Sequence, residues 1–364
     1  MDINQIVSNL EFYKNDYPNQ KKYIDKLIEL IYKCENSKDK NSMYQDNFKV
    51  NSYDELNNLL QKVIIKKESE EKIIREQINF YKGEGFNFEY ALYIPKNISS
   101  NSRLIVSTVN SGKSSNDFES GVFSLKSEYI FDNNVKEIFK ISEELGCPVM
   151  IPMIPRFRGY DTHILSYDVR NNNFDKAYDL SDDAKNISMN DMEKFRNLVE
   201  QEICMINDCI NRLQLPNQKA FITGFSAGSK AALKLANSNP ELFEAIAVGG
   251  TTGIEDVENL DMPILIQNGL KDRNNPVAYL TCFSEEEKNT LSTRYNFDFS
   301  LKNTELKEIF EKRARDNTKE NVRYINYENF GHDVGETKEY YDEIKKYFNL
   351  IMNYNLDEKD SKKI

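Results

Sequence analysis

The chain has 364 residues, of which 39% are hydrophobic and 29% charged, so it can bury a substantial core and is too long for one small domain. Its formal net charge of −11 at pH 7 argues against nucleic acid or an anionic membrane surface as the main partner, because both require a positive field. The N-terminal residues lack the pattern of a secretory signal, and no apolar run is long enough to span a membrane. We therefore expect a cytoplasmic protein.

The first 70 residues are predicted to be helical. Apolar residues recur at helical spacing over 3–10 and again over 23–31. A third helix is expected to follow Ser52, because Ser52 and Glu55 match the capping-box pattern. We expect an N-terminal helical extension over residues 1–70, and the sequence leaves open whether it packs on the rest of the chain or on a second copy.

The period of the apolar residues changes after residue 70. Ile74, Ile78 and Phe80 alternate with polar residues, as do the apolar residues of 86–94, and the stretch KGEG at 82–85 supplies a turn. Alternation on both sides of a turn predicts an antiparallel hairpin.

From residue 103 onward, predicted strands alternate with predicted helices, which implies a mostly parallel sheet covered by helices on both faces. We assign residues 71–352 to this domain and 353–364 to a flexible tail. A mostly helical stretch over 277–320 interrupts the alternation and predicts a lid inserted on the loop side of the sheet. The predicted strands are 103–109, 147–154, 219–225, 244–250, 262–269 and 321–327, and the predicted helices are 133–145, 192–213, 227–238 and 338–354.

The stretch FITGFSAGSK, residues 221–230, places a serine between two glycines where a predicted strand meets a predicted helix. It matches Gly-x-Ser-x-Gly as Gly224, Ser226 and Gly228. A serine on such a tight turn has a strained backbone, and only small residues two positions away on either side avoid a clash with it. Ser226 could instead be a helix N-cap, but the strand before it and the helix after it favour a nucleophile.

A nucleophilic serine needs a base, and the chain has two histidines. His332 follows the predicted strand 321–327 and precedes the last helix, whereas His163 lies before the serine, so His332 is the candidate base. Asp272 lies in the turn after the predicted strand 262–269 and is the candidate carboxylate that orients the imidazole.

Other acidic residues compete with Asp272 for this role. Asp333 is a poorer candidate because adjacent residues seldom direct their side chains together, and Glu255 and Asp256 are second choices. Arg156 and Arg158, like His163, follow the predicted strand 147–154 and could line the rim of a cleft. Surface solvation or structural ion pairing is favoured over such a role for these arginines, because exposed charges usually signify little.

No cofactor or metal is expected. The chain has no cluster of His, Cys and carboxylate residues at metal-ligand spacing, and NSGKSS at 110–115 lacks the leading glycine of a phosphate-binding loop. The five cysteines are an odd number without Cys-x-x-Cys spacing, which is typical of reduced thiols. They are Cys34, Cys147, Cys204, Cys209 and Cys282.

The order of these motifs along residues 70–352 resembles the α/β-hydrolase superfamily. The resemblance implies an α/β-hydrolase fold in which Ser226 is the nucleophile, His332 the general base and then acid, and Asp272 the orienting carboxylate. The motifs that carry it are GFSAG at 224–228, QNGLKDRNNP at 267–276 and FGHD at 330–333.

The resemblance also implies an oxyanion hole that uses the backbone N–H of Ala227 and one N–H from the loop VNSGKSS. Asn110 and Ser111 stand where this family commonly has His and Gly. Because a backbone donor depends on geometry more than on its side chain, either Ser111 or Gly112 could be the second donor. The stretch 92–112 is similar to the branch that contains esterases, polyhydroxyalkanoate-depolymerase-like and prolyl-oligopeptidase-like proteins.

The expected function is a serine hydrolase that cleaves a carboxylic ester through an acyl-enzyme intermediate, acting on a small-molecule ester or a short peptide. One alternative is a serine peptidase of prolyl-oligopeptidase-like type, with the helical extension or the lid screening peptide size. Another is a non-catalytic binding protein on a hydrolase fold, with residues 1–70 docking a partner.

Overall fold

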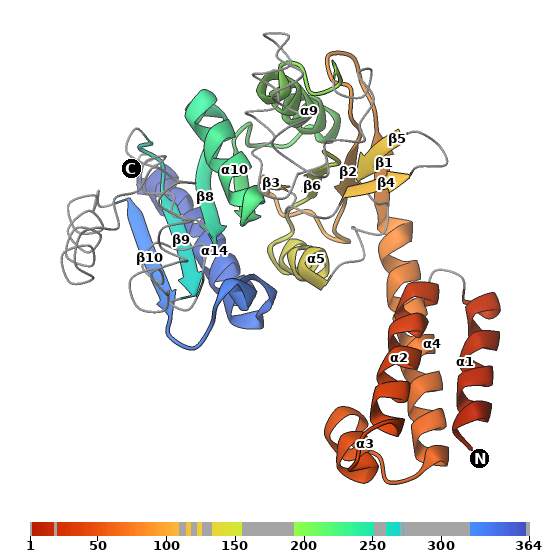
Figure 1. The fold of residues 1–364 in the computed structure, drawn as a ribbon. Helices are drawn as coiled ribbons and strands as arrows, with labels where there is room; N and C mark the ends of the chain where they lie inside the picture. The colour runs from red at the N-terminus through yellow and green to blue at the C-terminus, as the bar shows by residue number, and fades with distance from the viewer. Residues whose placement is uncertain are drawn as a thin grey trace, which may run out of the picture. The chain divides into compact units, whose positions relative to one another are not determined.

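A computed structural model of the chain (Figure 1) describes residues 2–17, 20–108, 114–117, 122–125, 133–154, 193–250, 260–269, 272 and 321–361. It forms two compact units, Met1–Ile78 and Asn79–Ile364. The boundary lies later than the predicted end of the helical extension at residue 70. The reason is that the last helix of the first unit continues to Gln77.

The described part of the first unit consists of four helices, which share one apolar core. Ile6 and Leu10 of the first helix and Leu56 and Leu60 of the last are buried in it, because residues four apart lie on the same side of a helix. The helices are α1 (Ile3–Asp16), α2 (Lys21–Glu35), α3 (Lys40–Phe48) and α4 (Tyr53–Gln77).

The capping pattern at the start of α4 is present. The backbone N–H of Glu55 donates to Ser52 Oγ at 3.2 Å, and the Glu55 carboxylate accepts from the N–H of Asn51 at 2.8 Å, one residue before the expected partner. The other end of α4 corrects the sequence analysis. Ile74 lies inside this helix, so the strand predicted there begins only at Ile78.

The second unit contains an eight-stranded sheet in the order β1-β2-β6-β3-β7-β8-β9-β10. The strand β2 is antiparallel to β6, and the pairs from β6 and β3 through β9 and β10 are parallel. β1 and β2 are neighbours, as expected for the predicted hairpin. The strands are β1 (Ile78–Tyr81), β2 (Tyr90–Tyr93), β3 (Leu104–Ser107), β6 (Val149–Pro152), β7 (Ala220–Phe225), β8 (Phe243–Gly249), β9 (Ile264–Gly269) and β10 (Val322–Tyr327).

Helices pack on this sheet in two groups (Figure 1). α9 (Leu198–Leu213) contacts α10 (Ala227–Ser238), and α5 (Asn133–Leu145) contacts α14 (Lys338–Ser361). Successive side chains of a strand point to opposite faces. In β7, accordingly, Ile222 joins the core that includes α9 and α10, whereas the ring of its neighbour Phe221 stacks on Phe348 of α14 at 4.4 Å.

Several boundaries differ from the predicted ones. α9 begins at Leu198 rather than at 192, and α14 continues to Ser361, through most of the segment 353–364 that was expected to be a flexible tail. A two-stranded antiparallel sheet, β4 (Ser114–Asp117) with β5 (Val122–Leu125), was not predicted. The expected lid at 277–320 lies outside the described residues.

Among the residues that the structure describes, no helix is long and apolar enough to cross a membrane. No group of three or more His, Cys, Asp or Glu side chains in the same ranges is arranged to hold a metal ion. Cys34, Cys147, Cys204 and Cys209 are free thiols, and Cys282 lies outside these ranges.

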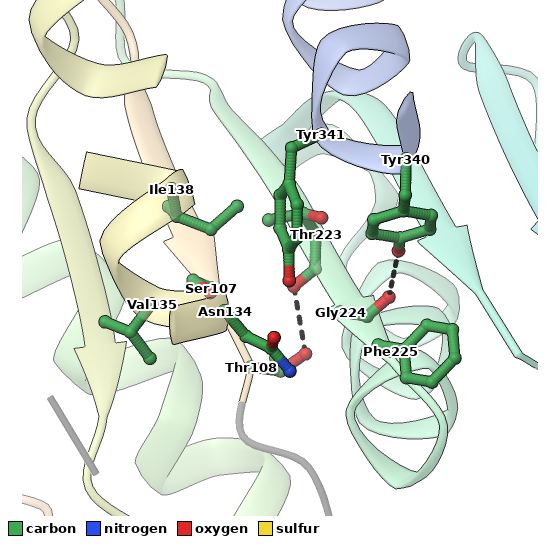
Figure 2. A pocket seen from close by; sticks show the side chains of 10 residues that line it. All are labelled: Ser107, Thr108, Asn134, Val135, Ile138, Thr223, Gly224, Phe225, Tyr340 and Tyr341. Carbon is green, nitrogen blue, oxygen red and sulfur yellow. Dashed lines mark hydrogen bonds between the residues drawn. The ribbon is translucent and has the colours of Figure 1, made fainter. Parts of the chain in front are cut away.

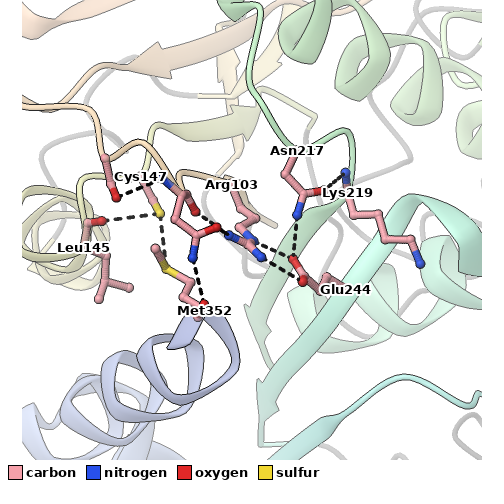
Figure 3. Close-up of polar contacts among 9 residues, drawn as sticks. Arg103, Leu145, Cys147, Asn217, Lys219, Glu244 and Met352 are labelled. Carbon is pink, nitrogen blue, oxygen red and sulfur yellow. Dashed lines mark hydrogen bonds and ion pairs between the residues drawn. The ribbon is translucent and has the colours of Figure 1, made fainter. Parts of the chain in front are cut away.

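A buried ion pair joins the amino ends of β3 and β8 (Figure 3), at the edge of the sheet opposite to the turn that carries Ser226. Arg103 Nε and Nη2 contact the two oxygens of Glu244 at 2.6 and 3.0 Å. Arg103 Nη1 donates to the backbone and side-chain oxygens of Asn101, and Asn217 donates to Glu244 at 3.3 Å. These contacts satisfy a guanidinium that is only 1% exposed.

We expect Arg103→Met to lower the free energy of unfolding by about 3–5 kcal/mol, because it leaves the Glu244 carboxylate without its buried counter-charge. Urea denaturation measures the effect. The matched control is Arg323→Met, which removes a 58% exposed arginine that lies 3.6 Å from Glu343 and should cost less than about 1 kcal/mol. Equal losses in the two variants would contradict a special role for the buried pair.

Candidate active site

Ser226 lies on the turn between β7 and α10 and has a backbone conformation that a serine rarely adopts, with φ 55° and ψ −120°. It occupies the N-cap position of α10, but its side chain makes no capping hydrogen bond. The strain of such a conformation is on the order of 1–3 kcal/mol and persists only where the surroundings enforce it. The helix therefore does not use the Ser226 hydroxyl, and this observation disfavours the N-cap interpretation.

The neighbouring strand holds this turn in place. The Ser226 N–H donates to the carbonyl oxygen of Gly249, the last residue of β8, at 2.9 Å. One turn into α10, the buried Ser229 Oγ accepts from the Gly249 N–H at 3.1 Å. The same hydroxyl lies 2.5 Å from the Gly249 oxygen and 2.9 Å from the Gly224 oxygen, so it can donate its proton to either. These contacts offset the backbone strain.

The first motif glycine is required by close packing. A Cβ atom on Gly224 would lie 2.2 Å from Thr108 Oγ1 and 2.5 Å from the carbonyl carbon of Gly228. No side chain fits between the strand and the first turn of α10 at this separation. The steric reason inferred from the Gly-x-Ser-x-Gly pattern therefore applies to Gly224.

His332 and Asp272 meet on loops that follow adjacent parallel strands. Asp272 lies in a turn after β9, where its N–H donates to the Gly269 oxygen at 3.0 Å, and its side chain is fully buried. His332 begins the 3₁₀ helix η4 (His332–Glu336) after β10. Its Nδ1 is 2.8 Å from Asp272 Oδ2. If Nδ1 carries the proton that this contact needs, Nε2 is the ring atom that can accept another proton.

The histidine loop reaches the serine turn through close packing. A Cβ atom on Gly269, at the end of β9, would lie 2.3 Å from the carbonyl oxygen of Gly331, so the end of β9 and the histidine loop touch through their backbones. The His332 ring is 4.9 Å from the ring of Phe225, the residue before Ser226, and the imidazole is 37% exposed. Asp333, the adjacent competitor, accepts the N–H of Gly331 at 2.8 Å within its own loop.

The structure describes one of the two expected oxyanion donors. Ala227 is the first residue of α10, and N–H groups of the first turn have no partner within their own helix. Ser111 and Gly112 lie outside the described residues, as do the second-choice acids Glu255 and Asp256. The cleft-rim candidates Arg156, Arg158 and His163 also lie outside them.

Sequence reasoning missed the side chains that surround the serine turn from other elements. The buried Tyr340 of α14 donates its hydroxyl to the Gly224 oxygen at 3.1 Å (Figure 2). Burial raises the pKa of Tyr340, so it stays a donor at neutral pH. With Thr108, Phe225 and neighbouring residues it lines a cavity of about 20 Å³, room for a single water molecule. No local pattern marks Tyr340, because it is one apolar position of an amphipathic helix.

The strand order, with an antiparallel second strand, places a strained serine turn after a central parallel strand. The turn is followed along the chain by an aspartate and then a histidine that contact each other, and this strand-turn-helix context and chain order are typical of one fold. The chain has the α/β-hydrolase fold. Within this fold, the carboxyl ends of β7, β9 and β10 carry the serine, aspartate and histidine loops.

Comparison with known proteins finds similarity only at the level of structure. No protein-family model matches the chain, and no curated protein matches it. Solved structures of α/β hydrolases are similar to it. They include a thermostable esterase (16% identity, 71% of this chain and 56% of that chain, TM-score 0.37), acetyl xylan esterase from Aspergillus awamori (16%, 70% and 93%, 0.39) and an S-formylglutathione hydrolase from Agrobacterium tumefaciens (12%, 76% and 94%, 0.44). The chain thus spans little more than half the length of the thermostable esterase.

Proposed function

We propose that the protein is a serine hydrolase of esterase type that cleaves a carboxylic ester through an acyl-enzyme intermediate. The observation that carries the proposal is the combination of a strained serine whose hydroxyl is not used as a helix cap with a histidine held by a buried aspartate at 2.8 Å. Backbone strain and a buried charge both oppose stability. Their presence at one edge of the sheet is therefore better explained by catalysis than by folding.

In the first half of the reaction, Ser226 Oγ forms a bond to the carbonyl carbon of the ester while His332 Nε2 takes the hydroxyl proton. The electron pair of the carbonyl double bond moves to its oxygen, where the Ala227 N–H and an N–H of Ser111 or Gly112 stabilise the negative charge. When the tetrahedral intermediate collapses, the bond to the alcohol oxygen breaks and His332 returns the proton to the leaving alcohol.

In the second half, a water molecule takes the place of the alcohol. His332 removes one of its protons as the water oxygen attacks the acyl carbon. When the second intermediate collapses, the bond between Ser226 Oγ and the acyl carbon breaks, His332 returns the proton to Oγ, and the carboxylic acid leaves. Asp272 orients the imidazole through Nδ1 in both halves of the reaction. Because its carboxylate is fully buried, its attraction for the imidazolium is stronger than it would be in water.

Labelling with a fluorophosphonate probe tests the proposed nucleophile. We expect the wild-type protein to be labelled and mass spectrometry to locate the adduct on Ser226. Ser226→Ala should not be labelled, whereas the matched control Ser238→Ala should be labelled at the wild-type rate, because Ser238 lies at the far end of the same helix and its hydroxyl donates to the Lys234 carbonyl oxygen in α10. An adduct on another residue, or none on the folded wild type, would refute the proposal.

The substrate class is tested on the same preparation. Nitrophenyl esters of increasing acyl length are compared with peptide nitroanilides that have the same leaving-group chromophore. We expect turnover of esters and no comparable turnover of peptides. Faster cleavage of the peptides would favour a peptidase, and labelling without turnover of either class would leave a reactive serine without the proposed hydrolytic activity.

A further inference from the structure

Thr108 lies at the end of β3, immediately before the stretch that contains Ser111 and Gly112. Its side chain is almost completely buried, with 2% exposed. The Thr108 N–H donates to the Thr223 oxygen at 2.9 Å, which extends the parallel pairing of Ser107 with Thr223 by one residue. The backbone of Thr108 is therefore set by the sheet, and its hydroxyl is held beside the serine turn.

The Thr108 hydroxyl contacts the chain on both sides of Ser226. Its Oγ1 lies 2.7 Å from the Gly228 oxygen in the first turn of α10 and 3.0 Å from the Thr223 oxygen in β7. Figure 2 shows Thr108 between β3 and the strand that carries Thr223 and Gly224. The Thr108 hydroxyl thus joins the end of β3 to the start of α10. Its oxygen is also one of the atoms against which Gly224 packs.

We propose that Thr108 is a positioning residue for the turn that carries Ser226 and for Ala227, the expected oxyanion donor in the first turn of α10. A nucleophile must be held in place to react, and an oxyanion donor must lie within about 2.7–3.1 Å of the oxygen that it stabilises. The Thr108 hydroxyl contacts the backbone on both sides of this turn, at Thr223 and at Gly228, and so holds the first turn of α10 against β7. This inference rests on the proposed function, because it assigns a role within that site.

Three variants test the role of this hydroxyl. Thr108→Val removes it and keeps the branched shape that suits the end of a strand, Thr108→Ser keeps it and removes the methyl group, and Thr223→Val makes the same Thr→Val change at a buried position that lines the same cavity. Thr223→Val retains the Thr223 carbonyl that Thr108 contacts. All three are compared with the wild type and with Ser226→Ala for kcat and KM on a nitrophenyl ester, rate of fluorophosphonate labelling, and Tm.

We expect Thr108→Val to lower kcat by about tenfold to a hundredfold, the effect of a misplaced catalytic group, and to change KM by less than about threefold, since uniform binding is not affected. Labelling should slow in parallel, because the probe develops negative charge at the same position. Thr108→Ser should recover most of kcat, and Thr223→Val should stay within about threefold of the wild type.

The inference is overturned if Thr108→Val has the kcat of the wild type, if Thr108→Ser is as slow as Thr108→Val, or if Thr223→Val loses as much as Thr108→Val. If Thr108→Val does not fold, as judged by Tm and circular dichroism, Thr108→Ala replaces it and is compared with Thr108→Ser by the same criteria. Ser226→Ala distinguishes a failure of the proposed function from a failure of the role of Thr108. Full activity in Ser226→Ala would refute the proposed function itself, whereas an inactive Ser226→Ala with an unimpaired Thr108→Val would refute only the role of Thr108.

Discussion

Ser226→Ala is expected to lower kcat on an activated ester by at least about 10⁴-fold, because loss of a serine nucleophile leaves only the acceleration that binding and the oxyanion donors supply. The hydroxyl does not serve as a cap of α10, so its removal should not unfold the protein. The measurement is steady-state turnover, with active-site titration to exclude wild-type contamination. Activity within tenfold of the wild type would contradict the assignment of the nucleophile.

A second substitution at the same position tests the strain. Ser226 has a φ of 55°, which glycine adopts without a steric penalty. Ser226→Gly should therefore be as inactive as Ser226→Ala and about 1 kcal/mol more stable than it, the cost of left-handed backbone being partly cancelled by the greater freedom of glycine in the unfolded chain. Urea denaturation of the two variants measures the difference. Equal stability would mean that the turn is not strained.

Asp272→Asn is expected to lower kcat by about 10⁴-fold with little change in KM, as loss of the orienting carboxylate does in other triads. An asparagine that donates its N–H to His332 Nδ1 would place the ring proton on Nε2. His332 could then no longer accept the proton of Ser226. The size of the effect follows from the geometry, because Asp272 is fully buried and contacts Nδ1 at 2.8 Å.

Asp333→Asn is the matched control for this substitution. Asp333 is adjacent to His332, but its carboxylate accepts the Gly331 N–H at 2.8 Å, a bond that the asparagine oxygen also makes. We expect kcat to stay within about threefold of the wild type. A large loss in Asp333→Asn together with a small loss in Asp272→Asn would assign the orienting role to Asp333. Proton NMR of the His332 ring reports the tautomer in each variant.

Most elements of the second unit could be predicted from apolar periodicity because each is a local pattern. The helices 133–145 and 227–238 have the predicted bounds, and the strand cores over β7 and β9 lie where buried runs indicated them. Failures occurred where a local pattern was ambiguous. Ile74 fits both a strand and the end of α4, and propensity did not reveal that the helix continues to Gln77.

The candidate site was predicted unevenly for a similar reason. The contact of His332 with Asp272 agrees with the pairing that the family resemblance implied. The side chains that support the serine turn were not predicted, since Thr108 and Tyr340 carry no motif. The second oxyanion donor, Ser111 or Gly112, stays a prediction.

The sequence by itself determined the turn at Ser226, because the small residues around it and the strand and helix on either side act within a few positions of one another. The tertiary structure decided which distant groups meet there. Parallel strands joined by crossovers bring Thr108 to Gly228, His332 to Asp272 and Tyr340 to Gly224. That placement depends on the order of the strands in the sheet, which no local interaction encodes.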